Sequence, residues 1–275
     1  MGAAQTSMGS LLKEPVKSHD PFDPNNWDIW TEDEETQQEA RLTAPRRNYA
    51  EIDAAVNVAI NHLDEDAELH HNWNDISLGG PVEPFMPTMP WNGILIVGKA
   101  PGDAELAHGE PFTGRSGRLL DRMLSRLKID RPACMITNAF RMQAPWSVDA
   151  DGKKQPNDVS YFFTDDPRAG NDRLPALNGR WVIKGGPDDH IRDLWRLIRD
   201  HKPRVVLAMG AIAAWAITGD GTLKDRMGQP LANPCSDAPV VLAYHPAYAL
   251  HKKDEAIAAL IAEHVGIARD IAASL

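Results

Sequence analysis

Hydrophobic residues along the chain alternate between short continuous runs and stretches with helical spacing. Short apolar runs bounded by turn residues are typical of buried parallel strands. Four such runs cover residues 93–98, 134–138, 204–209 and 239–244. Spacing of three and four residues predicts helices over residues 49–63, 116–127, 188–201, 210–217 and 255–272. The pattern therefore predicts strands that alternate with helices.

This alternation indicates an α/β fold, and we expect a three-layer sandwich whose mostly parallel central sheet is flanked by helices. In such sheets, functional groups gather at the carboxyl ends of the strands. The candidate domain covers residues 49–275. It includes a polar excursion at residues 145–185 that is rich in Asp, Gly and Pro. Residues 1–48 are expected to form an acidic, flexible segment because they show little apolar periodicity.

Charge is distributed unevenly along the chain. Residues 1–90 contain seventeen Asp and Glu against five Lys and Arg, so the other 185 residues carry +2 of a total of −10. An acidic total therefore does not exclude a nucleic-acid partner, because the larger part can present a basic face to phosphates. No apolar run approaches the roughly 18 residues of a membrane span. We expect a monomer in the cytoplasm without membrane contact.

Candidate functional residues follow three of the four predicted strands. The first strand leads into Gly98-Lys-Ala-Pro-Gly-Asp103, and then Gly109-Glu-Pro-Phe-Thr-Gly-Arg-Ser-Gly-Arg-Leu-Leu120. The second strand ends in Thr137-Asn138, and the fourth ends in Tyr244-His-Pro-Ala247. The phosphate-binding patterns Gly-x-Gly-x-x-Gly and Gly-x-x-x-x-Gly-Lys-Ser/Thr are absent. The sequence thus predicts one site at the strand ends without a nucleotide fingerprint.

In their order, these segments resemble the uracil-DNA glycosylase superfamily, most closely its family 4 branch, over roughly residues 93–270. Proteins of that branch have a Gly-Glu-Ala-Pro-Gly motif and a Gly-x-Pro-Phe-Val-Gly-x-x-Gly-x-Leu-Leu motif. An Asn then ends the next strand, and a His-Pro-Ser/Ala motif comes late. Each motif alone is weak, but four in this order are specific. The resemblance implies a DNA glycosylase that flips uracil or a related pyrimidine out of DNA and hydrolyses its N-glycosidic bond.

The resemblance also implies roles within the pocket. Phe112 would stack on the flipped base, and Asn138 would read the pyrimidine edge with its amide donor and acceptor. His245 would donate a hydrogen bond to uracil O2, where the departing base gathers negative charge. The backbone of the turn would help to hold the base, and this turn consists of Ala100, Pro101 and Gly102.

Contacts with the rest of the DNA are implied in the same way. Leu250 would fill the gap that the flipped base leaves, and Lys252 and Lys253 would hold phosphates. The helix start at Ser116 and Gly117 offers further backbone N–H groups to a phosphate. Taken singly, each of these residues has a structural alternative, such as a core aromatic, a strand-terminating Asn or a solvated lysine.

The chain departs from the family 4 pattern in its cysteines. That branch typically holds an iron–sulfur cluster on four cysteines. This chain has two, Cys134 and Cys235, and neither precedes the first predicted strand. We therefore expect no metal and no cofactor.

The second departure is Lys99, which stands where the motif has Glu. An ammonium there would repel the cationic sugar of the transition state, and it acts as a base only if burial lowers its pKa. Three interpretations stay open. In the first, a carboxylate places the water; this is Glu105, which matches an acidic position of the motif and is favoured, or Asp103. Alternatively, Lys99 attacks the sugar in a lyase or transferase of modified pyrimidines. Finally, the pocket binds base-modified DNA without hydrolysing it.

Overall fold

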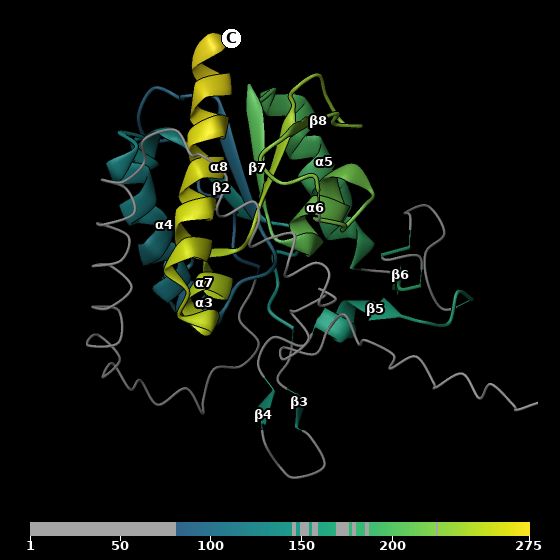
Figure 1. Cartoon of the computed structure of the whole chain (residues 1–275). Coiled ribbons are helices and arrows are strands. Elements are labelled where there is room, and N and C mark those ends of the chain that lie inside the picture. The colour runs from purple at the N-terminus through teal and green to yellow at the C-terminus, as the bar shows by residue number, and fades with distance from the viewer. Residues whose placement is uncertain are drawn as a thin grey trace, which may run out of the picture.

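The computed structural model describes residues 81–144, 147–148, 154–155, 159–168, 176–177, 180–184, 187–223 and 225–275. At its centre is a five-stranded sheet in the order β2-β1-β7-β9-β8 (Figure 1). The strands are β1 (Ile94–Gly98), β2 (Met135–Asn138), β7 (Val205–Met209), β8 (Pro230–Leu231) and β9 (Val240–Ala243). Only β8 pairs antiparallel within this sheet. The prediction of a mostly parallel sheet is therefore confirmed.

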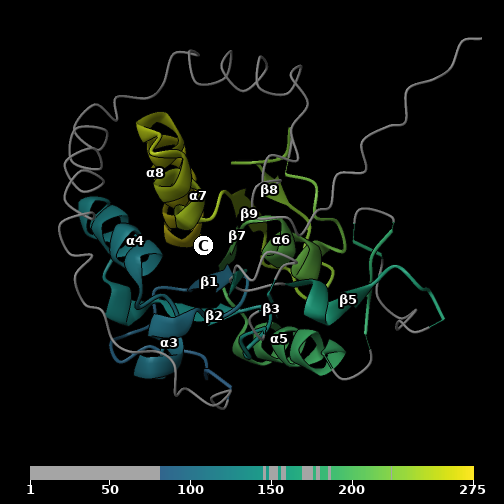
Figure 2. The same ribbon diagram turned by 90° about the horizontal axis from the view of Figure 1, so that it is seen from below.

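Helices cover both faces of this sheet. Figure 2 shows α4, α7 and α8 on one face, and α5 and α6 on the other. Their bounds are α4 (Arg115–Arg126), α5 (Asp188–His201), α6 (Ala211–Thr218), α7 (Pro246–Lys252) and α8 (Glu255–Ser274). A short helix α3 (Asp103–His108) follows β1, and a 3-10 turn η2 (Arg131–Ala133) precedes β2. The predicted three-layer α/β sandwich is confirmed.

The central strands are apolar because both of their faces are covered. Every residue of β1, β2, β7 and β9 is buried. A strand with one solvent-exposed face would alternate apolar and polar residues, but a strand between two helical layers has no face in solvent and is apolar on both. This burial explains why the sequence showed continuous runs and why those runs marked the strands within one residue.

The strand order points to one end of the sheet as the place for a ligand. The connection from β1 through α4 to β2 leads to one side of β1, whereas β7 lies on its other side. The strand order therefore reverses between β1 and β7, and ligands of open α/β sheets bind outside the carboxyl ends at such a point. The residues that follow these two strand ends begin at Lys99 and at Gly210.

The excursion after β2 contains short paired strands. β3 (Ser147–Val148) pairs with β4 (Lys154–Gln155), and β5 (Phe163–Thr164) pairs with β6 (Val182–Ile183). A 3-10 helix η3 (Val159–Phe162) precedes β5. Strands of two residues are too short to show a period in sequence, so the pattern predicted only a loop or small excursion here.

Two earlier expectations lie outside the described residues, namely the helix over residues 49–63 and the acidic segment 1–48. Within the residues described, no helix has the length and apolar character needed to cross a membrane.

Candidate functional site

Residues from three motifs meet at the carboxyl end of β1. Gly98 and Asn138 are partners in the parallel pairing of β1 with β2. A Cβ atom on Gly98 would lie 2.4 Å from Asn138 Oδ1 and 2.7 Å from Cε2 of the Phe112 ring. The rings of Phe112 and His245 stack with their centroids 5.3 Å apart and their planes inclined by 26°. The structure thus brings Asn138, Phe112 and His245 together around a position that only glycine can occupy.

The side chain of Asn138 is buried beside these rings. The residue is 4% exposed, yet its amide makes no hydrogen bond with any residue that the structure describes. Its amide atoms are not among the fully buried unpaired atoms of the described residues, so they keep contact with solvent. An amide that is accessible and unbonded at the end of β2 can pair with a ligand that offers both a donor and an acceptor.

Phe112 sits in a strained turn that several groups hold in place. Its φ angle of 56° lies in the left-handed region, where a residue with a side chain is uncommon. Its N–H donates to Glu105 Oε1 at 2.5 Å, and Arg131 donates to the neighbouring carbonyl of Pro111 at 2.8 Å. A Cβ atom on Gly117 would lie 1.8 Å from the Phe112 carbonyl oxygen. The first turn of α4 therefore needs glycine where the Phe112 backbone crosses it.

Glu105 braces both turns of the site. Besides Phe112, it accepts from the Gly102 N–H through Oε2 at 2.5 Å. Burial raises the pKa of its carboxyl, although the two backbone hydrogen bonds and the charges of Arg131 and Lys99 oppose that rise. Its two oxygens thus fix the Ala100–Gly102 turn relative to the aromatic ring. That Glu105 also places water stays a prediction.

His245 follows the end of β9 by two residues and caps the first turn of α7. Its Nδ1 atom accepts a hydrogen bond from the Ala247 N–H at 3.2 Å. A neutral imidazole that accepts at Nδ1 carries its proton on Nε2, so that nitrogen is a donor. Burial, together with the charge of Lys99, lowers the pKa of His245 to about 3. The ring is therefore a neutral hydrogen-bond donor at every pH of physiological interest.

Lowering the pH is expected to destabilise the fold through His245. A histidine in the unfolded chain titrates near pH 6.5, whereas the folded ring stays neutral down to about pH 3. Below pH 6.5 the unfolded chain thus binds a proton that the folded one refuses, which favours unfolding. Between pH 7 and pH 4, the free energy of unfolding measured with urea should fall by about 1–3 kcal/mol more in the wild-type protein than in His245→Asn. Equal losses in both proteins would contradict the lowered pKa.

Asp103 and Lys99 stand on either side of the same turn. Gln143, which is 8% exposed, donates from its amide to Asp103 Oδ1 at 2.6 Å. The carbonyl of Lys99 accepts from the Phe140 N–H at 2.9 Å, which ties this turn to the segment after Asn138. Its side chain is close enough to His245 and Glu105 to lower the pKa of each. Both residues therefore belong to the site.

The predicted DNA contacts differ in their exposure. Lys252 and Lys253 are exposed at the end of α7, and the Lys252 ammonium lies 5.9 Å from the centre of the Tyr248 ring. Leu250 is half-buried and packs against the core. Ser116 is half-buried, whereas Gly117 is buried under Phe112. Their roles on DNA stay predictions, and the structure additionally gives Gly117 the task of accommodating Phe112.

Sequence reasoning missed several residues that shape the site. Gly210, with a φ of 93°, follows β7, and a Cβ there would lie 3.5 Å from the Cβ of His245. Gln143 and Arg131 hold Asp103 and the Phe112 turn as described above. A glycine directly after a buried strand could have marked Gly210. No local pattern could have marked the two polar residues, because their partners are 40 and 20 residues away.

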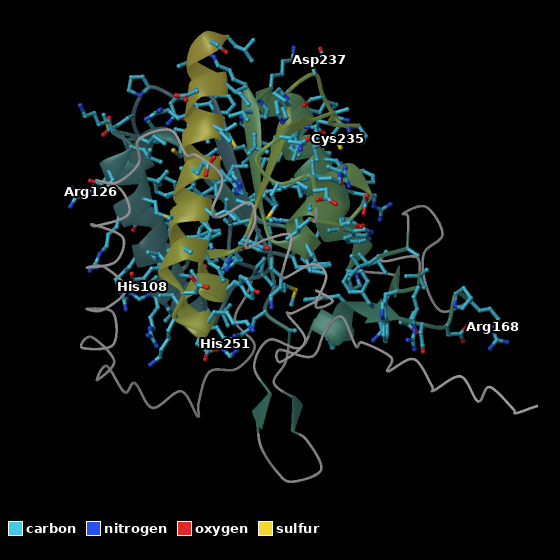
Figure 3. All side chains as sticks on the ribbon, viewed as in Figure 1. His108, Arg126, Arg168, Cys235, Asp237 and His251 are labelled. Carbon is cyan, nitrogen blue, oxygen red and sulfur yellow. The ribbon has the colours of Figure 1, made fainter. Side chains whose placement is uncertain are left out.

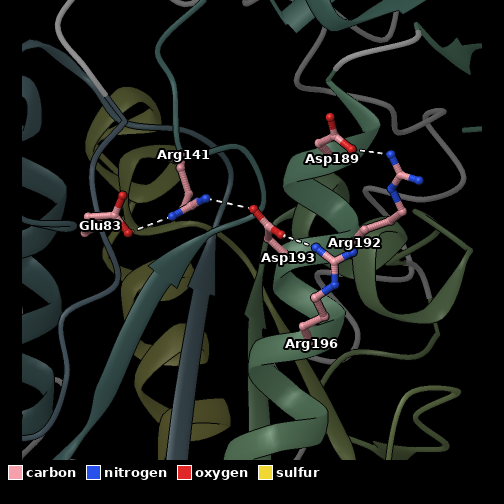
Figure 4. Close-up of polar contacts among 6 residues, drawn as sticks. All are labelled: Glu83, Arg141, Asp189, Arg192, Asp193 and Arg196. Atoms are coloured by element: carbon pink, nitrogen blue, oxygen red, sulfur yellow. Dashed lines mark hydrogen bonds and ion pairs between the residues drawn. The ribbon is translucent and has the colours of Figure 1, made fainter.

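The segment after Asn138 is anchored by a charged network (Figure 4). Arg141 bonds Glu83 at 2.6 Å and Asp193 of α5 at 2.8 Å. Asp193 in turn bonds Arg196 at 2.7 Å. This network joins the chain before β1, the segment after β2 and a helix of the opposite layer, so it keeps the segment after Asn138 in place.

The cysteines do not fit an iron–sulfur cluster. Such a cluster needs four thiolate ligands, and the sequence supplies two. Cys134 is buried and accepts a hydrogen bond from the Asn92 amide at 3.2 Å, and burial raises the pKa of its thiol. Burial raises the pKa of the Cys235 thiol to about 11. In the described part of the chain, no three His, Cys, Asp or Glu residues form a group that could hold a metal ion.

Part of this chain is similar to known proteins. A type-4 uracil-DNA glycosylase of Pyrobaculum aerophilum is 45% identical over 53 residues, which are 19% of this chain and 27% of that protein. That of Archaeoglobus fulgidus is 42% identical over 52 residues, which are 19% of this chain and 26% of that protein. That of Sulfurisphaera tokodaii is 37% identical over 59 residues, which are 21% of this chain and 27% of that protein. The chain thus spans about a quarter of the length of these curated relatives. The family model for the uracil DNA glycosylase superfamily matches residues 90–264. By its fold, its motifs and this match over most of its length, the chain belongs to the uracil DNA glycosylase superfamily.

Proposed function

We propose that this protein removes uracil, or a closely related pyrimidine, from DNA by hydrolysing the N-glycosidic bond. The observation that carries the proposal is the amide of Asn138, which makes no hydrogen bond with the described residues and keeps contact with solvent beside Phe112 and Gly98. Uracil presents O4 and N3–H side by side, and one amide can pair with both. Cytosine presents an amino group and an unprotonated N3 at the same places. The Asn138 amide therefore suits uracil when its Nδ2 faces O4 and its Oδ1 faces N3–H.

Phe112 and His245 complete the recognition of the base. A flipped base needs an aromatic face, and Phe112 is held in position by its turn. Its ring is only 1% exposed and contacts the imidazole. A base between two rings at a centroid distance of 5.3 Å has no room. Binding therefore exchanges part of the existing ring contact for the base, which contributes to the selection of a flat, small pyrimidine.

His245 supplies the main stabilisation of the transition state. As the bond between C1′ and N1 breaks, its electron pair leaves with the base, and negative charge spreads to O2. A neutral donor at Nε2 bonds this oxygen more strongly in the transition state than in the substrate. Because its pKa is lowered to about 3, His245 donates a hydrogen bond without handing over its proton.

Asp103 is the carboxylate better suited to place the attacking water. Both oxygens of Glu105 accept backbone N–H groups at 2.5 Å, so this residue serves the turns. Asp103 accepts from Gln143 through one oxygen, Oδ1. Its other oxygen can hold a water molecule while the first keeps the carboxylate oriented. We therefore assign water placement to Asp103 and the bracing of the pocket to Glu105.

The phosphates of the DNA would follow the basic side of α4 and α7. Four arginines recur at spacings of three and four along α4 and so lie on one side of it, namely Arg115, Arg118, Arg122 and Arg126. This helix packs against α7, at whose end Lys252 and Lys253 are exposed. A cationic surface of this kind binds DNA through its backbone and depends on salt. We keep the expectation that the protein acts as a monomer in the cytoplasm.

Lys99 supports a second candidate function, in which its amine attacks the sugar. It lies close enough to His245 and Glu105 to lower the pKa of both. Only an uncharged amine forms a Schiff base, so this reaction requires that Lys99 first lose its proton. Hydrolysis is therefore the favoured reaction, and a DNA-binding protein without activity is the remaining alternative.

Hot alkali distinguishes these alternatives on a labelled single-stranded oligonucleotide with one uracil. Hydrolysis leaves an abasic site, so alkali should cut the strand at that position but leave a thymine control intact. Borohydride trapping of a protein–DNA adduct that disappears in Lys99→Ala would instead establish the covalent reaction. Binding without alkali sensitivity would establish the third alternative and refute the proposed hydrolysis.

A further inference from the structure

An exposed aromatic ring with a cation beside it lies on the excursion after β2. Tyr161 is 52% exposed, although it lies within the ordered turn η3. The Lys184 ammonium lies 5.8 Å from the centre of its ring and donates to the Tyr161 carbonyl oxygen at 3.0 Å. The ring of Phe162 packs edge-on against Tyr161 at 5.4 Å. The tyrosine is thus packed against Phe162 and Lys184 while about half of its surface remains in solvent.

This pair is connected to the pocket by direct packing. Phe162 stacks on Phe140 with centroids 4.1 Å apart and planes inclined by 10°. Phe140 comes two residues after Asn138, and its N–H donates to the Lys99 carbonyl at 2.9 Å. On the other side, Phe163 packs edge-on against Trp215 of α6 at 5.1 Å. Tyr161 is therefore held by the same segment that presents the base-reading amide.

The Tyr161–Lys184 pair also lies toward the end of the sheet that carries the candidate site. Figure 1 shows β5 and β6 beside the central sheet, at the height of its lower end, where α3 and α7 also lie. Figure 3 shows the labelled side chains His108, of α3, and His251, of α7, at this end, and Arg168 at the outer edge of the excursion. DNA that delivers a base to the strand ends passes over this end of the sheet.

We propose that Tyr161 and Lys184 form a platform for the DNA strand outside the pocket, on which one unpaired base stacks while the lysine contacts a phosphate. The inference rests on the proposed function for its substrate class. An exposed aromatic face accepts any base, and a neighbouring cation suits the backbone that carries it. A base within a duplex has no free face to offer. The platform therefore favours single-stranded DNA on one side of the uracil.

Fluorescence anisotropy with a labelled oligo-thymidine that lacks uracil tests the platform without requiring catalysis. Tyr161→Ala should weaken binding of this single strand by about tenfold, since one base stack contributes roughly 1–3 kcal/mol. Tyr161→Phe should retain the affinity because the ring is kept. Lys184→Gln should weaken binding and lower the salt dependence by roughly the 0.7 expected for one phosphate contact. Duplex DNA of the same length should respond little to any of these changes.

Met89→Ala provides the matched control. Met89 is 47% exposed, but its N–H bonds the carbonyl of Pro132 at the amino end of β2, away from the pocket. Its replacement should leave binding unchanged. Unaltered affinity in Tyr161→Ala, or no binding of the single strand by the native protein, would overturn the platform. If binding depends on Tyr161 but uracil is never released, the platform stands and the proposed glycosylase activity fails.

Discussion

Replacing His245 with alanine is expected to slow uracil release by about a hundred- to a thousandfold, the usual effect of losing one donor to a developing anion. The imidazole is already oriented by the Ala247 N–H and already neutral, so the wild-type ring needs no rearrangement of protons to donate. Because the lost interaction forms mainly in the transition state, kcat should fall far more than KM rises. Single-turnover rates on a uracil-containing single strand measure this effect.

His251→Ala is the control for that experiment. His251 lies in the last turn of α7, the helix that His245 caps, and is exposed (Figure 3). Its replacement should change the rate less than twofold, within the range of an ordinary surface substitution. Equal losses in the two variants would mean that the histidines act through the stability of α7, and the assigned role of His245 would be wrong.

Gly117→Ala is expected to have the largest effect on stability. The new Cβ atom would lie 1.8 Å from the carbonyl oxygen of Phe112 and 2.1 Å from its carbonyl carbon. These are backbone atoms of a residue whose N–H is held by Glu105 and whose preceding carbonyl, that of Pro111, is held by Arg131, so they cannot swing aside. The free energy of unfolding measured with urea should fall by more than about 3 kcal/mol, which is rare for the addition of one methyl group. Uracil release should fall as well, because Phe112 leaves its place.

Gly114→Ala tests whether that loss is specific. Gly114 caps the same helix with a φ of −78°, and a Cβ there would meet only the Ala104 methyl at 3.4 Å. We expect a cost below about 1 kcal/mol, typical of replacing a glycine cap by alanine. A similar cost in Gly117→Ala would show that the Phe112 turn moves easily, contrary to the bracing described above.

The sequence predicted the central sheet because burial on both faces leaves a strong local signal. Leu95, Ile96 and Val97 are fully buried and form a continuous apolar run. The edge strand β8 was missed because it has two residues and begins with proline. The helices α3 and α7 were missed because they have six and seven residues, too few for a helical period.

The candidate site was predictable only where a residue stands in a motif. Phe112, Asn138 and His245 were named from the sequence, and the structure brings them together around Gly98. The tasks of individual side chains depend on contacts that no spacing reveals. Glu105 matched an acidic motif position, yet its hydrogen bonds to two backbone N–H groups became visible only in the folded chain.

The most direct test of the account is the intact mass of the DNA after reaction. The purified protein is incubated with an unlabelled single strand that contains one uracil, and the oligonucleotide, protein and small molecules are weighed by mass spectrometry. We predict free uracil and an equal amount of full-length abasic strand, with the protein mass unchanged. An unaltered strand, a strand broken at the uracil or a protein carrying the DNA would contradict hydrolysis of the glycosidic bond in this pocket.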